Sequence, residues 1–208
     1  MKYPIQIVEL NADLSLYIPV PEKIKKIYNQ LISIDANSPF PFWAKLWASS
    51  KALSKFLVSN PYLIKDKIVL EIGAGIGQPC FTIVGIAKKV IISDYNYDAL
   101  SLIRKNIVNL GLTNAQGILL DWNEFDYSIQ ADVILLSDIN YAPCDFKPLL
   151  QVIEHYISTN AVIIIATPQR IMGMPFIDSL QAFIKHSYVE SILDQESVVM
   201  IRLYVLYK

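Results

Sequence analysis

The chain has 208 residues, a net charge of −1 at pH 7 and a hydrophobic fraction of 53%. This length fits a single domain, and the apolar content excludes an intrinsically disordered chain. The small net charge provides no overall field that would attract nucleic acid or an anionic membrane surface. We therefore expect neither as a partner.

The apolar stretches are much shorter than the ~20 residues that a membrane-spanning helix needs. The first residues show no basic region followed by an apolar run, so we expect no secretory signal. Two cysteines, Cys80 and Cys144, lie far apart in the chain. Such sparse cysteine usage favours a reducing compartment without disulfides. We therefore expect a cytoplasmic protein with no membrane contact.

The N-terminal part shows one weakly alternating segment and two helical patterns. Alternation over 5–18 predicts a strand or hairpin. Apolar residues at helical spacing predict one helix over 22–34 and a second helix over 43–57. We expect residues 1–60 to form an extension that covers the ligand site of a core at 61–208.

Short apolar runs alternate with helical stretches from residue 67 onward. The first five runs are rich in β-branched residues, which is typical of strands buried on both faces. Alternating strands and helices predict an α/β fold with a doubly wound, mostly parallel sheet of seven strands. The last two strands follow each other directly, which indicates an antiparallel C-terminal hairpin. The predicted strands are 67–72, 90–94, 116–120, 133–138, 161–167, 188–193 and 198–207, and the predicted helices are 78–87, 97–110, 145–156 and 173–186.

A glycine-rich turn follows the first strand of this core. It reads Glu71-Ile72-Gly73-Ala74-Gly75-Ile76-Gly77 and leads into a helix. Glycines at such a turn let the backbone bend sharply and approach a ligand beside a helix N-terminus. A cofactor crevice is therefore predicted above this turn. Gln78 stands where the dinucleotide fingerprint G-x-G-x-x-G has its third glycine, and this departure disfavours NAD.

Acidic residues end three successive predicted strands. They are Asp94, Asp121 and Asp138, and the carboxyl ends of parallel strands meet at one edge of a sheet. Asp94 lies 21 residues after Gly73, a spacing suited to binding the hydroxyls of a ribose. Both NAD and S-adenosylmethionine carry a ribose, but an acidic edge repels a pyrophosphate and attracts a cationic sulfonium.

The glycine turn and the strand-end acids together resemble the motifs of class I, seven-strand S-adenosylmethionine-dependent methyltransferases, which have a Rossmann-like fold. The resemblance covers nearly all of residues 43–208. Trp43, Trp47 and the string Asp138-Ile139-Asn140-Tyr141 more narrowly resemble the lysine methyltransferase subgroup. Bacterial members of that subgroup are often called nicotinamide N-methylase-like. The resemblance to this subgroup implies that Trp47 covers the cofactor.

The resemblance implies roles for residues on the cofactor side of the crevice. Glu71 and Gly73 would line the methionine end, and Asp94 would hold the ribose. Asp121 would face the adenine amino group, while Trp122 packs on the ring. The full implied cofactor-binding set is Trp47, Glu71, Gly73, Ala74, Gly75, Gly77, Asp94, Tyr95, Asp121, Trp122 and Ser137.

Candidate catalytic residues follow the fourth strand. Asp138 can orient an amine, the Tyr141 ring can stabilise a developing ammonium, and Asn140 can add a polar contact. Methyl transfer from a sulfonium is an in-line displacement that depends on holding a neutral nucleophile in place. His155 and His186 each stand alone on predicted helices, so no metal site is predicted. We expect N-methylation of a protein lysine.

Three alternatives stay open from the sequence. The acceptor is a small amine or heteroaromatic compound in the first, and the chain is a non-catalytic cofactor-binding module in the second. The third is an NAD-dependent reductase. The intact Asp138 and Tyr141 argue against the second alternative. The missing third glycine and the absence of a Tyr-x-x-x-Lys string near the fourth and fifth strands argue against the third. The sequence makes no prediction about oligomeric state.

Overall fold

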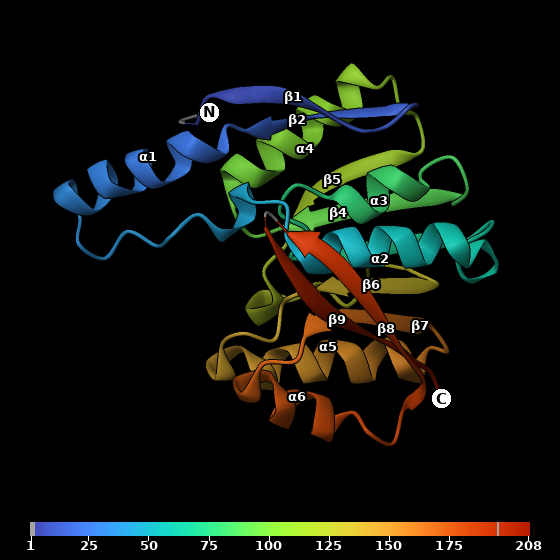
Figure 1. The fold of residues 1–208 in the computed structure, drawn as a ribbon. Helices are drawn as coiled ribbons and strands as arrows, with labels where there is room; N and C mark the ends of the chain where they lie inside the picture. The colour runs from blue at the N-terminus through green and yellow to red at the C-terminus, as the bar shows by residue number, and fades with distance from the viewer. Residues whose placement is uncertain (1–2, 195) are drawn as a thin grey trace.

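A seven-stranded sheet forms the centre of the molecule in the computed structural model, which describes residues 3–194 and 196–208 (Figure 1). Its strands are β3 (Ile68–Ile72), β4 (Lys89–Asp94), β5 (Ala115–Leu119), β6 (Val133–Ser137), β7 (Val162–Pro168), β8 (Ile184–Asp194) and β9 (Ser197–Leu206). Their order is β5-β4-β3-β6-β7-β9-β8. Strands β3 to β7 pair in parallel, whereas β9 runs antiparallel to both β7 and β8. The predicted Rossmann-like sheet with an antiparallel C-terminal hairpin is confirmed.

The strand order reverses between β3 and β6. From β3 the chain moves outward through β4 to β5, and it then returns to the other side of β3 with β6. Crevices form at the carboxyl ends of the strands at such a reversal, because the connections leave in opposite directions. The glycine turn after β3 lies at this point.

Helices cover both faces of the sheet. Successive strand residues point to opposite faces, so Val69 belongs to one apolar cluster and Leu70 to the other. Helices α2, α3 and α4 contribute to the first cluster, and α5 and α6 contribute to the second. The helices are α1 (Pro21–Ile34), α2 (Ala48–Ser59), α3 (Gln78–Ile83), α4 (Tyr97–Asn109), α5 (Phe146–Ser158) and α6 (Met174–Ser179). No helix in the described part of the chain is long and apolar enough to cross a membrane.

The N-terminal residues form the expected hairpin, with β1 (Ile5–Asn11) antiparallel to β2 (Leu14–Pro19). The buried Asn106 of α4 holds this hairpin, because its side chain bonds both the N–H (2.8 Å) and the carbonyl (3.0 Å) of Tyr17. Leu16 of β2 is fully buried in the first apolar cluster. Helix α1 extends away from the sheet (Figure 1) and has Ile24 as its buried residue. The boundary at residue 60 remains a prediction.

Two predicted helices have wrong ends, one before the first core strand and one directly after it. The helix over 43–57 begins only at Ala48, because Phe42–Ala44 form a separate 3-10 turn after Pro41. Trp47 is the N-cap of α2 rather than a residue of its apolar face. The helix over 78–87 ends at Ile83.

The predicted helix over 173–186 is also wrong, since α6 ends at Ser179 and β8 begins at Ile184. His186 therefore lies in a strand. The reason is that the predicted strand 188–193 extends back to Ile184, where its residues still pair with the C-terminal end of β9. Helical apolar spacing cannot report that pairing.

Candidate functional site

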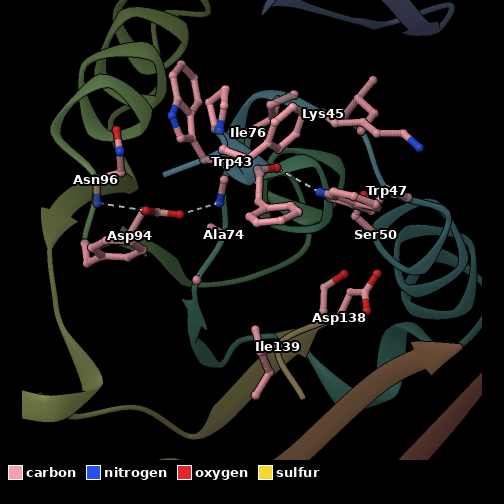
Figure 2. A pocket seen from close by; sticks show the side chains of 18 of the residues that line it. Trp43, Lys45, Trp47, Ser50, Ala74, Ile76, Asp94, Asn96, Asp138 and Ile139 are labelled. Atoms are coloured by element: carbon pink, nitrogen blue, oxygen red, sulfur yellow. Dashed lines mark hydrogen bonds between the residues drawn. The ribbon is translucent and has the colours of Figure 1, made fainter. Parts of the chain in front are cut away.

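A cavity of about 410 Å³ opens at the carboxyl edge of the sheet, where the strand order reverses (Figure 2). The glycine turn and the residues that follow β4 and β6 line its floor and sides. The connection between α1 and α2 covers it with several residues between 38 and 47. Its volume lies within the ~300–1,000 Å³ of small-molecule sites.

The glycine turn packs closely against the covering segment. Gly73, Gly75 and Gly77 have φ values of 65°, 56° and 79°, which side chains rarely adopt. A Cβ at Gly75 would also lie 2.9 Å from the carbonyl oxygen of Trp43. Only glycine therefore lets this turn approach the backbone of the 3-10 turn that roofs the cavity.

Asp94 joins the end of β4 to the glycine turn. One carboxylate oxygen accepts the N–H of Gly75 at 2.8 Å, and the other accepts the N–H of Asn96 at 2.9 Å. Figure 2 shows both bonds at the margin of the cavity. Asp94 is 4% exposed, and this burial raises its pKa against the opposing effect of the backbone bonds. The carboxylate is thus held in a fixed position beside the cavity.

Glu71 lies behind the turn and does not line the cavity. Its Oε2 accepts the N–H of Cys80 at 3.3 Å, while Oε1 has no partner among the described residues. Burial raises the pKa of Glu71 to about 8. The sequence-based expectation that Glu71 lines the methionine end therefore differs from its place in the structure.

Aromatic residues form the wall on the β4 side. Tyr95 and Trp122 line the cavity with ring centroids 6.5 Å apart. Asp121 does not line it, because its side chain caps the turn Trp122–Glu124 by accepting the N–H of Asn123 at 2.8 Å. Its carboxylate is exposed over a neighbouring shallow hollow.

Asp138 lies at the opposite side of the cavity from Asp94 (Figure 2). Its φ of 57° is in the left-handed region, and its N–H donates to the carbonyl of Ala166 at 2.8 Å. Its carboxylate forms a bidentate ion pair with Arg170, in which Nη2 lies 3.0 Å from Oδ2. Burial raises the pKa of Asp138, and the nearby cations Arg170 and Lys45 oppose this effect.

An aromatic cluster faces this side of the cavity. The Phe42 ring lies 5.7 Å from Tyr141 and 6.2 Å from Trp47, measured between centroids. The Trp47 indole donates to the carbonyl of Phe42 at 2.9 Å, and Lys45 Nζ lies 4.6 Å from the Trp47 ring centroid. Burial raises the pKa of Tyr141 to about 12, so its phenol stays protonated at neutral pH.

Asn140 points away from the cavity. It is 3% exposed, accepts the hydroxyl of Thr167 at 2.7 Å and donates to the carbonyl of Gly173 at 3.3 Å. A Cβ at Gly173 would lie 2.5 Å from the Asn140 amide nitrogen. Asn140 therefore fixes the turn after β7 and does not line the cavity, and its contact with a reacting group stays a prediction.

The cavity thus brings together most of the residues that the sequence singled out, and it adds Arg170, Phe42 and Lys45. Arg170 could have been found from the strand order, because it follows the strand next to β6. The other two carry no sequence signal. Among residues 3–194 and 196–208, no group of three or more His, Cys, Asp or Glu could hold a metal ion. The predicted residues that line the cavity are Trp47, Gly73, Ala74, Gly75, Gly77, Asp94, Tyr95, Trp122, Ser137, Asp138 and Tyr141, whereas Glu71, Asp121 and Asn140 do not.

A family model described as "Lysine methyltransferase" matches residues 32–186. The chain is 25% identical over 168 residues to "Protein N-terminal and lysine N-methyltransferase EFM7" of Cryptococcus neoformans, covering 74% of this chain and 54% of that protein. It is 27% identical over 121 residues to human "Histone-arginine methyltransferase METTL23", covering 55% of this chain and 64% of that protein. The match thus spans about half to two thirds of these relatives.

The fold is similar to solved structures as well. That of M. jannaschii TYW2 in complex with AdoMet has a TM-score of 0.61 and 16% identity, covering 99% of this chain and 86% of that chain. Identity at this level supports the shared fold alone.

Proposed function

The chain belongs to the lysine methyltransferase family, and on that premise we propose that it transfers methyl groups from S-adenosylmethionine to a lysine side chain of a protein. One observation carries the proposal. A single cavity has the glycine turn and Asp94 on one side, and Asp138 with its aromatic neighbours on the other. A cofactor and an acceptor can therefore meet in one enclosed space.

The cofactor side fits S-adenosylmethionine. The glycine turn lines the cavity, and its glycines carry no side chains that would stand between the backbone and a ligand. Each carboxylate oxygen of Asp94 accepts one backbone hydrogen bond, so each can still accept another from a ribose hydroxyl. We assign the adenine to the wall of Tyr95 and Trp122, and contact from Asp121 to its amino group remains a prediction.

The acceptor side suits an amine. S-adenosylmethionine supplies a methyl group on a positively charged sulfur, and the nucleophile must reach it as a neutral amine in line. Asp138 can accept a hydrogen bond from that amine. The rings of Phe42, Trp47 and Tyr141 line the same side of the cavity, and an aromatic face there can stabilise the positive charge that develops on nitrogen.

A protein lysine is the acceptor that the family description and the EFM7 name support. The METTL23 name points to arginine, so amino-acid analysis of the methylated product must decide. A small amine stays the alternative for the same cavity. We also propose a cytoplasmic location, which the two free cysteines support.

Calorimetric titration with S-adenosylhomocysteine and with NAD tests the cofactor assignment. We expect S-adenosylhomocysteine to bind and to raise the melting temperature. NAD should do neither, because the carboxylate of Asp94 beside the glycine turn disfavours a pyrophosphate there. Binding of NAD without any response to S-adenosylhomocysteine would overturn the methyltransferase proposal.

A further inference from the structure

The acidic group of the acceptor side already holds a cation from the chain itself. The side chain of Asp138 is 8% exposed, and both of its oxygens pair with the guanidinium of Arg170. A second cation, Lys45, lies over the Trp47 ring on the same side of the cavity. The two groups best suited to an incoming ammonium are therefore both engaged.

The side chain of Arg170 reaches the site from the turn after β7. Among the residues that the structure describes, its guanidinium makes hydrogen bonds only to Asp138. Its backbone belongs to the turn that Asn140 fixes through Gly173, and its side chain is 41% exposed. Rotation of the side chain can thus release Asp138 without moving the turn.

An ammonium and the guanidinium compete for Asp138. A bidentate pair uses both carboxylate oxygens, and a second cation beside it meets repulsion that the poorly exposed site screens weakly. Displacement of the Arg170 guanidinium from Asp138 costs free energy, and the binding of the acceptor must supply it. A protein acceptor has many contacts outside the amine to supply it, whereas a small amine has few.

We propose that Arg170 is a specificity-determining residue, which occupies Asp138 until a lysine that belongs to a protein replaces it. This inference rests on the proposed function and deepens it, because it gives a structural reason for excluding small amines. In it Arg170 does not take part in methyl transfer. It sets how much binding free energy the acceptor must gain from its other contacts before its amine pairs with Asp138.

The test is a binding titration with N-acetyl-lysine methylamide, a lysine without the rest of a protein. Affinity is measured by NMR for the wild type and for Arg170→Gln, with and without S-adenosylhomocysteine. The pH is 8.5, because loss of Arg170 raises the pKa of Asp138 further while the probe amine remains largely protonated. Arg104→Gln, which changes an arginine of α4 that does not line the cavity, is the matched control.

We expect Arg170→Gln to bind the probe at least tenfold more tightly than the wild type and Arg104→Gln. Arg170→Lys should give a smaller gain, since an ammonium can still pair with Asp138. The affinity for S-adenosylhomocysteine should differ less than twofold among the four proteins. The double variant Asp138→Asn, Arg170→Gln should lose the gain, because the acid that binds the probe is gone.

Equal probe affinity in the wild type and Arg170→Gln would overturn the proposal, as would no measurable binding by either. A gain that persists in the double variant would also overturn it. If S-adenosylhomocysteine fails to bind the wild type, the proposed function fails instead. The titration without cofactor still decides the role of Arg170 in that case.

Discussion

The carboxylate of Asp94 accepts a hydrogen bond from the backbone N–H of Gly75 at 2.8 Å. This bond joins two neighbouring strands at the edge where the cavity opens, because Asp94 ends β4 and Gly75 belongs to the turn after β3. The side chain that we assign to the ribose also holds the turn that approaches the cofactor. Its loss should affect both cofactor binding and the shape of the turn.

Asp94→Asn keeps the size of the side chain and removes its charge. In the variant, an amide nitrogen replaces one carboxylate oxygen, so one of the two backbone N–H groups loses its acceptor. Each hydrogen bond to a charged acceptor is worth about 1.5–3 kcal/mol. We expect affinity for S-adenosylhomocysteine to fall at least tenfold in calorimetry. Asp178→Asn, at an exposed residue of α6, is the control and should bind normally. Unchanged affinity in a folded Asp94→Asn protein would remove the ribose assignment.

Gly75→Ala tests the close approach of the turn to its cover. Alanine is unfavourable at the φ of 56°, and its Cβ would also lie only 2.9 Å from the carbonyl oxygen of Trp43. Gly111→Ala is the matched control, because its φ of 63° is similar but its Cβ would meet nothing within 4 Å. Urea unfolding should show Gly111→Ala destabilised by about 1 kcal/mol and Gly75→Ala by clearly more. Equal losses would mean that backbone strain alone accounts for the glycine.

The buried Glu71 predicts a pH dependence of stability. Its pKa rises from an ordinary value of 4.5 to about 8 in the folded protein. Between these values the folded state binds more protons than the unfolded state, so the free energy of unfolding falls as pH rises. The stabilisation is complete below about pH 4.5 and is lost as pH rises through about 8. The slope amounts to at most about 1.4 kcal/mol per pH unit.

Glu71→Gln removes this titration and leaves that of Asp94 and Asp138 in place. Urea unfolding at several pH values between 5 and 8 should show the wild type losing stability relative to Glu71→Gln as pH increases. A constant difference between the two proteins would show that Glu71 titrates at an ordinary pKa.

Asp138→Asn separates the acceptor side from the cofactor side. The amide keeps much of the hydrogen bonding but cannot pair with a cationic lysine before it loses its proton. We expect turnover to fall at least tenfold while affinity for S-adenosylhomocysteine changes less than about threefold, a difference of roughly 1.4 kcal/mol or more. Equal losses of both would make Asp138 a cofactor ligand.

The sheet and most of the predicted site residues could be found from the sequence because their signals are local. Val133 to Leu136 form a continuous apolar run, and such a run identifies a strand buried on both faces. The glycine turn and Asp94 follow strand ends, where a doubly wound sheet gathers ligand-binding residues. Their place in one cavity therefore follows from topology.

The remaining features depend on contacts between distant parts of the chain. The helical apolar spacing predicts a helix at His186, whereas β8 begins at Ile184 and His186 pairs with Val205 near the far end of β9. The partners of Asn140 are Thr167 and Gly173, and the partner of Asp138 is Arg170, all in or after β7. Residue type suggests a polar contact from Asn140 in the site, whereas in the structure its side chain bonds the turn after β7. The ion pair of Asp138 changes the acceptor side most, since it places a cation where an open acid was expected.

Transfer of labelled methyl groups tests the central claim most directly. The protein is incubated with S-adenosylmethionine carrying a radiolabelled methyl group and with a lysate of the source organism, and Asp138→Asn serves as the control. The products are separated by size, and labelled protein is hydrolysed to amino acids. Our account predicts a labelled protein band that yields methyl-lysine and that is at least tenfold weaker with Asp138→Asn. Label confined to the small-molecule fraction, or found as methyl-arginine, would contradict it.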